Sequence, residues 1–131
     1  MQPVQFGPAA DNVCVDLLSE RIVRIALKPR ARMMAEDGAF ARENLLALTG
    51  GKPCTVLLQI TGVGSISREA ISFYSESTTV RAFAVLGTTP VDRVIAHGLL
   101  GLPRPSLCPT EFFLDPQDAL RWLDRHAPAA E

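Results

Sequence analysis

The sequence lacks the residue patterns that mark the common nucleotide, hydrolase and metal sites. It contains no GxGxxG, GxxxxGK[S/T], GxSxG or HExxH segment, so nothing supports a dinucleotide, P-loop, serine-hydrolase or zinc-protease site. The three cysteines, Cys14, Cys54 and Cys108, form no CxxC pair and suggest neither a disulfide framework nor a zinc site. Neither histidine, His97 or His126, lies in a catalytic motif. We therefore expect reduced, mostly buried thiols, with no metal and no cofactor.

Charge of one sign and long apolar runs are also missing. Thirteen Lys and Arg against 14 Asp and Glu give a net charge of −1, which argues against a generic nucleic-acid or anionic-membrane binder. Apolar stretches such as Val56 to Leu58 and Phe83 to Leu86 are far below the roughly 18 residues that cross a bilayer. Residues 1–10 contain no basic region followed by an apolar run, so no secretion signal is expected. The sequence thus predicts a cytoplasmic protein.

The composition is that of one folded domain. Of the 131 residues, 47% are hydrophobic and 21% charged, which is enough for a core and unlike a disordered chain. The length leaves room for a single domain. We place an N-terminal extension at residues 1–11 and the domain at residues 12–127.

Five segments have the residue pattern of strands. Apolar and polar residues alternate in Asn12 to Leu18 and in Ile22 to Leu27, and the short break between them favours an antiparallel hairpin. Cys54 to Ile60 and Val80 to Leu86 are nearly continuous apolar runs, which are typical of interior strands covered on both faces. A short last strand is expected at Thr110 to Leu114.

Four segments have the spacing and the end signals of helices. The first, Ala35 to Thr49, is followed by a Gly pair that favours a helix end. The second is expected from Ser67, as N-cap, to about Ser77. The third begins at Thr89 to Asp92, where a hydroxyl, a proline and a carboxylate follow in the favoured order, and runs to about Leu102. Asp115 to Asp118 repeats this signal for a last helix that ends near His126.

Steps of 100° per residue predict which side of each helix is buried. The residues expected to face inward are Phe40, Ala41, Leu45 and Leu48 on the first helix, Ala70, Ile71, Phe73 and Tyr74 on the second, Val91, Val94, Ile95, Gly98 and Leu102 on the third, and Ala119, Leu120 and Leu123 on the last, with Trp122 beside them over the sheet edge. On the third helix, Arg93, His97 and Leu100 then share the opposite face. They form a candidate interface for self-association or a partner.

The order is strand, strand, helix, strand, helix, strand, helix, strand, helix. Strands separated by helices imply right-handed crossovers and parallel pairing, whereas the first two strands form a hairpin. The predicted fold class is therefore α/β, with a mixed, mostly parallel five-stranded sheet, about four helices and an opening antiparallel hairpin.

Three segments carry a resemblance to a known family. TGGKP at Thr49 to Pro53 precedes the interior strand, GVGSISREA at Gly62 to Ala70 follows it, and ALRWL at Ala119 to Leu123 lies on the last helix. This arrangement resembles the STAS family, named for sulfate transporters and anti-sigma factor antagonists, and more narrowly short uncharacterised bacterial SpoIIAA-like proteins. The resemblance implies a STAS-like fold and a non-enzymatic regulatory or protein-interaction module, with a protein partner or a second copy of the chain as its target.

The phosphoswitch of STAS antagonists does not carry over residue by residue. In that family a segment of roughly Asp-Ser-Ser/Thr-Gly places a modifiable serine at a helix N-terminus. Here Ser67 matches the aspartate and Arg68 matches the phosphoserine, so we expect no such switch and interpret Ser67 as a helix cap. Ser65, Ser67 and Arg68 remain candidate regulatory or anion-binding residues.

Two other function classes remain open. SpoIIAA-like proteins are sometimes grouped with CRAL-TRIO lipid carriers, which gives a small-ligand or lipid-binding domain as the alternative; it requires an apolar cavity. An enzyme is the third reading, in which Thr61, Ser65, Ser67 and Arg68 beside Gly62 and Gly64 form an anion cradle.

Overall fold

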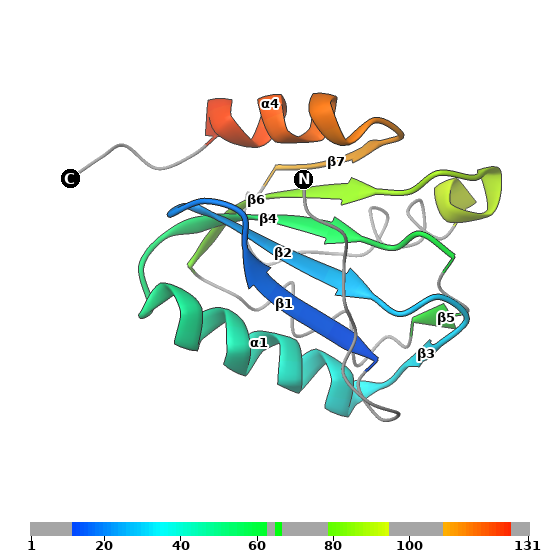
Figure 1. The fold of residues 1–131 in the computed structure, drawn as a ribbon, viewed down its shortest axis with the longest axis horizontal. Coiled ribbons are helices and arrows are strands. Elements are labelled where there is room, and N and C mark those ends of the chain that lie inside the picture. The colour runs from blue at the N-terminus through cyan, green and yellow to red at the C-terminus, as the bar shows by residue number, and fades with distance from the viewer. Residues whose placement is uncertain (1–11, 63–64, 67–78, 95–108, 127–131) are drawn as a thin grey trace.

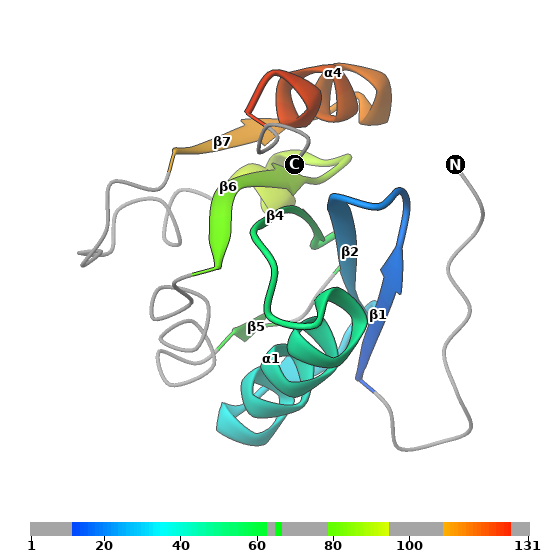
Figure 2. The ribbon, with the colours of Figure 1, turned by 90° about the vertical axis from the view of Figure 1, so that its left-hand side faces the viewer.

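A computed structural model describes residues 12–62, 65–66, 79–94 and 109–126 of the chain. Its centre is a five-stranded sheet that lies between two helices (Figure 1). Helix α1 (Ala35–Thr49) covers one face, and helix α4 (Pro116–His126) covers the other, as the turned view in Figure 2 shows. Residues 90–94 begin a further helix after the fourth strand of the sheet. The helix expected from Ser67 to Ser77 lies outside the described residues.

The sheet has the predicted mixed arrangement. Its strands are β1 (Val13–Leu17), β2 (Ile22–Leu27), β4 (Cys54–Gln59), β6 (Val80–Leu86) and β7 (Thr110–Phe113), in the order β1-β2-β4-β6-β7. β1 pairs with β2 antiparallel, and every other pair is parallel. The opening hairpin and the mostly parallel five-stranded sheet are therefore confirmed.

A second, two-stranded sheet was not predicted. β3 (Arg32–Met33) and β5 (Ser65–Ile66) pair in parallel, with Arg32 opposite Ser65. Strands of two residues have no detectable hydrophobic period, so the sequence carries no local signal for them.

Alternating side chains divide the interior into two clusters. The cluster between the sheet and α1 includes Val23, Ile25, Val56, Leu58, Val85, Ala41 and Leu45. The cluster between the sheet and α4 includes Leu57, Ala82, Ala84, Ala119 and Leu123. Trp122 is half-buried and packs against this second cluster, with its ring centroid 5.6 Å from that of Phe113. Trp122 therefore covers the sheet as predicted, but part of its ring remains exposed to solvent.

Two of the predicted buried faces are wrong in part: Ala41 and Leu45 on α1 are buried as predicted, and Ile95, Gly98 and Leu102 lie outside the described residues. On α1, Phe40 and Leu48 are 41% and 40% exposed, and the buried residues are Gly38, Ala41 and Leu45. The contact with the sheet is narrower than the predicted stripe, so residues at its flanks reach solvent. After β6, Val91 and Val94 are 65% and 71% exposed, while Asp92 between them is buried. The rotation of this helix start follows the hydrogen bonds of Asp92 rather than the apolar pattern.

Candidate functional site at the carboxyl ends of the parallel strands

The candidate site lies where β2, β4 and β6 end. These strands are parallel neighbours, so their carboxyl ends meet at one edge of the sheet, on the right of Figure 1. In α/β sheets the loops and helix starts that follow the parallel strands converge at this edge, which makes it the first place to look for a binding site. Here the three strands are followed by a turn at residues 28–31, a turn at residues 61–62 and the helix start at residue 90.

A buried carboxylate joins two of these segments. Asp92 is 1% exposed, and its Oδ2 atom accepts hydrogen bonds from the backbone N–H groups of Thr88 (2.8 Å) and Thr89 (3.1 Å). Its Oδ1 atom accepts a bond from the backbone N–H of Gly62 at 3.0 Å. The backbone N–H of Asp92 donates to the Thr89 hydroxyl at 3.2 Å, which confirms the helix start predicted there. Asp92 therefore ties the turn after β4 to the helix that follows β6.

The bonding of Asp92 also keeps the group ionised. Burial by itself raises the pKa of this carboxyl, but the backbone N–H groups of Thr88, Gly62 and Thr89 stabilise the charged form and hold the pKa below its usual value. A negative charge at a helix N-terminus is favourable because the N–H dipoles point toward it. This helix start is thus occupied by an anion of the chain itself.

Close packing around Asp92 requires a glycine at the end of β6. A Cβ atom on Gly87 would lie 2.5 Å from the Cβ of Asp92 and 3.1 Å from the Phe112 ring.

The guanidinium of Arg93 lies over the Phe112 ring, 5.4 Å from the ring centroid, in a cation–π contact. Arg93, predicted as an interface residue, is exposed and belongs to this end of the sheet, whereas His97 and Leu100 lie outside the described residues.

The turn after β2 has an arginine where glycine is usual. The backbone N–H of Ala31 donates to the Lys28 carbonyl at 3.2 Å, so Pro29 and Arg30 are the two central residues of a four-residue turn. Arg30 has a φ of 69°, as the third position of a type II turn requires, and a residue with a Cβ atom pays about 1–2 kcal/mol in this region. The sequence has proline at position 29 but no glycine at position 30, so the positive φ of Arg30 was not predicted.

The two turns are packed together. The backbone N–H of Arg30 donates to the Gly62 carbonyl at 2.7 Å. A Cβ atom on Gly62, which has a φ of 74°, would lie 3.4 Å from the Cβ of Pro29. Since Gly62 is also bound by Asp92, all three segments at this edge are connected through hydrogen bonds.

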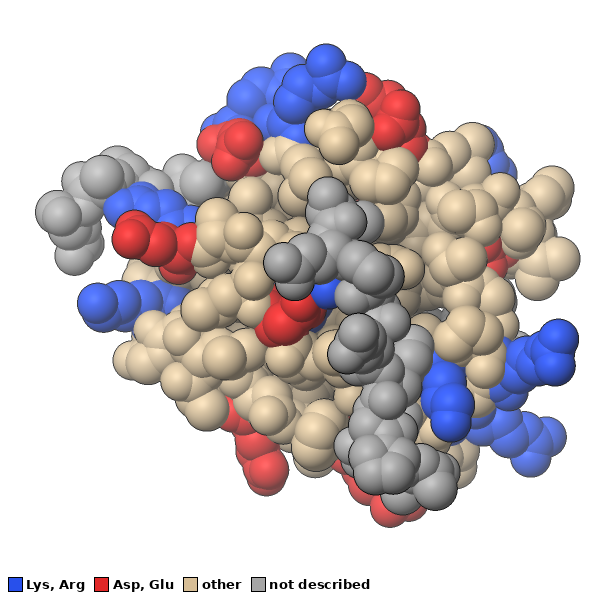
Figure 3. Space-filling view, viewed as in Figure 1, with Lys and Arg blue, Asp and Glu red and all other residues tan. Residues whose placement is uncertain are grey.

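Positive side chains project from this edge. We name Lys28, Arg30 and Arg32 the cationic turn: Lys28 is half-buried, the other two are exposed, and none forms an ion pair with a residue that the structure describes. Figure 3 shows basic side chains gathered on the right of the molecule, at the end where β2 finishes in Figure 1. Sequence reasoning missed this group, although three basic residues at every second position were a visible signal.

One predicted anion-binding residue lies next to the cationic turn. Ser65 is the register partner of Arg32 in the β3–β5 pair, so the backbone of the segment after β4 runs beside it. Ser67 and Arg68 lie outside the described residues. At Gly62, the N–H that the predicted anion cradle needs is bound by Asp92, and the carbonyl is bound by Arg30.

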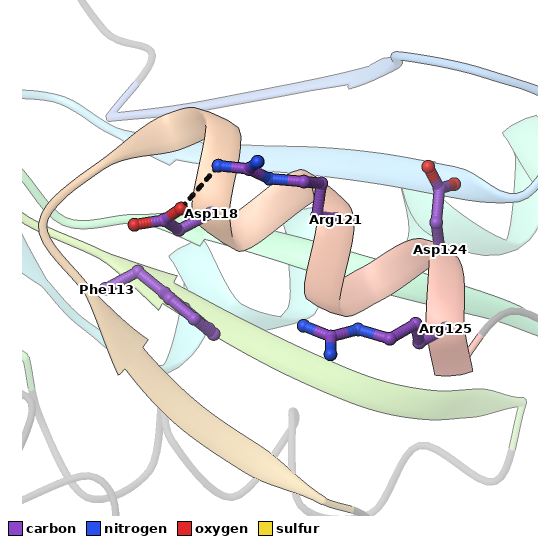
Figure 4. A pocket seen from close by; sticks show the side chains of 5 residues that line it. All are labelled: Phe113, Asp118, Arg121, Asp124 and Arg125. Atoms are coloured by element: carbon purple, nitrogen blue, oxygen red, sulfur yellow. Dashed lines mark hydrogen bonds and ion pairs between the residues drawn. The ribbon is translucent and has the colours of Figure 1, made fainter.

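A hollow lies between α4 and the end of β7. It is an open groove of about 640 Å3, lined by Phe113, Asp118, Arg121, Asp124 and Arg125. Asp118 and Arg121 form an ion pair of 2.6 Å. Figure 4 shows these two side chains turned toward each other, while Asp124 points away from Phe113. These groups do not converge on one point, and four of the five carry a charge, which suits neither an apolar ligand nor a single ion.

The described thiols are held in the neutral form. Burial raises the pKa of Cys54 to about 11, and it also raises the pKa of the half-buried Cys14, where the Asp16 carboxylate adds to the effect. Cys108 lies outside the described residues.

Within the described part of the chain, no group of three or more His, Cys, Asp or Glu side chains is placed to hold a metal ion. Among the same residues, no helix has the length and apolar character to cross a membrane.

A family model described as a domain of unknown function, DUF7793, matches residues 17–127. The chain belongs to this family. The DUF7793 match includes the cationic turn, Gly62 and Asp92, so the candidate site is part of the family domain. No curated protein matches the chain.

Two solved structures resemble this DUF7793 protein. An uncharacterised DUF3478-family protein with a SpoIIAA-like fold, from Shewanella loihica PV-4, is 20% identical; the alignment covers 94% of this chain and 98% of that one, with a TM-score of 0.56. A protein of unknown function from Arthrobacter sp. FB24 is 25% identical over 91% of this chain and 96% of that one, with a TM-score of 0.31. The first likeness shows that the fold is SpoIIAA-like, as the sequence resemblance predicted.

Proposed function

We propose that this DUF7793 protein is a non-enzymatic protein-interaction module of the regulatory, STAS type. We place its partner surface at the carboxyl ends of β2, β4 and β6. The observation that carries the proposal is the cationic turn, in which Arg30 and Arg32 are exposed and which has no ion-pair partner among the described residues. The SpoIIAA-like fold supports the class of function by analogy only, because one fold serves many functions.

Two further features of the same edge favour binding over catalysis. The buried carboxylate of Asp92 has both oxygens engaged by backbone N–H groups, so it is built to hold the segments together rather than to accept a proton from a substrate. Val91 and Val94 are 65% and 71% exposed on the helix start beside it. Apolar side chains beside charged ones are typical of protein interfaces, where the apolar centre is surrounded by a polar rim.

Affinity capture from the native host tests this function. The full chain is used as bait, together with a variant that carries Arg30→Glu and Arg32→Glu. Arg81→Glu is the matched control, since Arg81 is exposed near the start of β6, at the other end of the sheet. We expect one protein to be retained in constant proportion by the wild type and the control and to be lost from the double variant. Equal retention by all three baits would refute the proposed surface.

A further inference from the structure

Arg30 occupies a backbone conformation that glycine or asparagine adopts with less strain. Its φ of 69° is the only positive value on a non-glycine residue in the described part of the chain. Strained residues of this kind persist where the surrounding structure holds them, and they concentrate at binding sites and active sites. What arginine adds at this position is its side chain, which is exposed and has no ion-pair partner among the described residues.

We propose that the cationic turn binds a short acidic segment of the partner protein, with Arg30 as the anchor. The inference rests on the proposed function and adds the chemistry of the partner. A guanidinium group binds a carboxylate through two parallel N–H···O bonds, which gives direction as well as charge. Lys28 and Arg32, two residues before and after Arg30, supply charge for neighbouring carboxylates.

The charges around the turn favour a short acidic segment over a long polyanion. The next element, α1, begins at Ala35 and has Glu36 and Asp37 in its first turn, so two carboxylates follow Arg32 after three uncharged residues. The whole chain has a net charge of −1. A nucleic-acid strand needs many phosphate contacts for affinity, and three cationic side chains followed by two carboxylates do not supply them, whereas a segment with a few Asp or Glu residues needs no more than these three cations.

The hydrogen bonds of the site hold the backbone of Arg30 in place without a partner. Arg30 is bound to Gly62 through its backbone N–H, and Gly62 is bound to Asp92. A binding group on a preorganised turn loses less conformational entropy when the ligand binds. The strained backbone at Arg30 is therefore held by contacts that are independent of any partner.

The test separates binding from stability at this one residue. Arg30→Gly removes the side chain and relieves the backbone strain, so we expect a melting temperature higher by about 2–5 °C. The same variant is expected to bind a fluorescein-labelled oligo-glutamate peptide of about eight residues at least about tenfold more weakly. Arg30→Lys should retain part of the affinity, and Arg81→Ala, the control at the other end of the sheet, should retain all of it. Binding is measured by fluorescence anisotropy at about 50 and 200 mM salt.

Two matched probes decide between the classes of ligand. An oligo-glutamine peptide of the same length tests whether charge is required, and an oligothymidylate of the same length tests whether a phosphate backbone is preferred. The inference is overturned if Arg30→Gly leaves the affinity for oligo-glutamate unchanged, if oligo-glutamine binds equally well, or if oligothymidylate binds more tightly through Arg30. The two proposals can also be separated. If the double variant loses the captured native partner but the wild type binds no oligo-glutamate, the proposed function stands and the proposal of an acidic segment is wrong.

Discussion

The Oδ1 atom of Asp92 accepts a hydrogen bond from the backbone N–H of Gly62, which lies 30 positions earlier in the chain, at 3.0 Å. Gly62 in turn accepts a hydrogen bond from the backbone N–H of Arg30 through its carbonyl group. The backbone position of Arg30 is thus linked through Gly62 to a buried carboxylate on another segment. Asp92 acts as a positioning residue for the edge of the sheet at which we place the partner.

Asp92→Asn should destabilise the fold. The amide keeps one acceptor oxygen but directs an NH2 group at backbone donors, so at least one buried N–H loses its partner. We expect the free energy of unfolding to fall by about 2–4 kcal/mol, measured by urea denaturation. Asp118→Asn is the control, because Asp118 is exposed and forms a surface ion pair that contributes little. Equal effects of the two substitutions would show that the bonds of Asp92 are not stabilising.

The stability that Asp92 contributes should disappear in acid. Its pKa in the folded protein is below its usual value of 3.8, so the unfolded chain binds the proton first as the pH falls. The contribution is fully present above the unfolded pKa and is lost as the pH falls through the folded pKa. Unfolding curves of the wild type and Asp92→Asn, recorded from about pH 6 to pH 2, should therefore converge only at the acidic end. A constant difference across this range would contradict the assignment.

Asp16→Ala should lower the free energy of unfolding more than Arg24→Met does. Arg24 is 3% exposed in its side chain and binds Asp16 on the neighbouring strand through two bonds, of 3.0 and 2.7 Å. Removal of Asp16 takes away this partner from a buried cation, which costs about 3 kcal/mol, whereas methionine fills a similar volume without a charge. Chemical denaturation of the two variants gives the order. A smaller loss for Asp16→Ala would mean that Arg24 does not depend on this ion pair.

Two glycine substitutions should separate crowding from backbone strain. An alanine at Gly87 would place its Cβ atom 2.5 Å from that of Asp92, so we expect a loss of about 2–3 kcal/mol from forced movement of the chain. Gly50 ends α1 with a φ of 63° and nothing within 4 Å of the added atom, so alanine there should cost only about 1 kcal/mol. Thermal unfolding of Gly87→Ala and Gly50→Ala tests the order. The reverse order would show that the space beside Asp92 is not closed.

Trp122→Ala should lower the free energy of unfolding less than the same substitution of a fully buried tryptophan would. Part of its ring faces solvent, and the rest contacts Phe113 and the ring of His126, whose centroid lies 4.2 Å away. We expect the free energy of unfolding, measured by urea denaturation, to fall by about 2 kcal/mol. Leu123 is fully buried, so Leu123→Ala should lower it more. Acrylamide should quench the native tryptophan fluorescence partly. Complete protection from the quencher, together with a larger loss than for Leu123→Ala, would contradict the half-buried position.

The order and bounds of the main elements followed from local signals. Alternating residues gave β1 and β2, continuous apolar runs gave β4 and β6, and a Gly pair gave the end of α1. The start of α4 also agreed, since the Asp115 side chain accepts a hydrogen bond from the backbone N–H of Gln117 at 2.8 Å. Such signals act over a few residues, through side-chain period and capping, and therefore can be detected without the fold.

The sequence by itself therefore determined the α/β class, the order along the chain of the five strands of the main sheet, and the likeness to SpoIIAA. Only the tertiary structure decided which residues form the candidate site, because the hydrogen bonds that connect the three turns, from Arg30 to Gly62 and from Gly62 to Asp92, join segments about 30 residues apart. Asp92 is buried, against the apolar pattern around it, since its carboxylate meets N–H groups at the ends of two strands. Arg30 takes a glycine-like conformation because the turn after β4 holds it there. Hydrogen bonds between distant segments have no local period, so no reading of neighbouring residues predicts them.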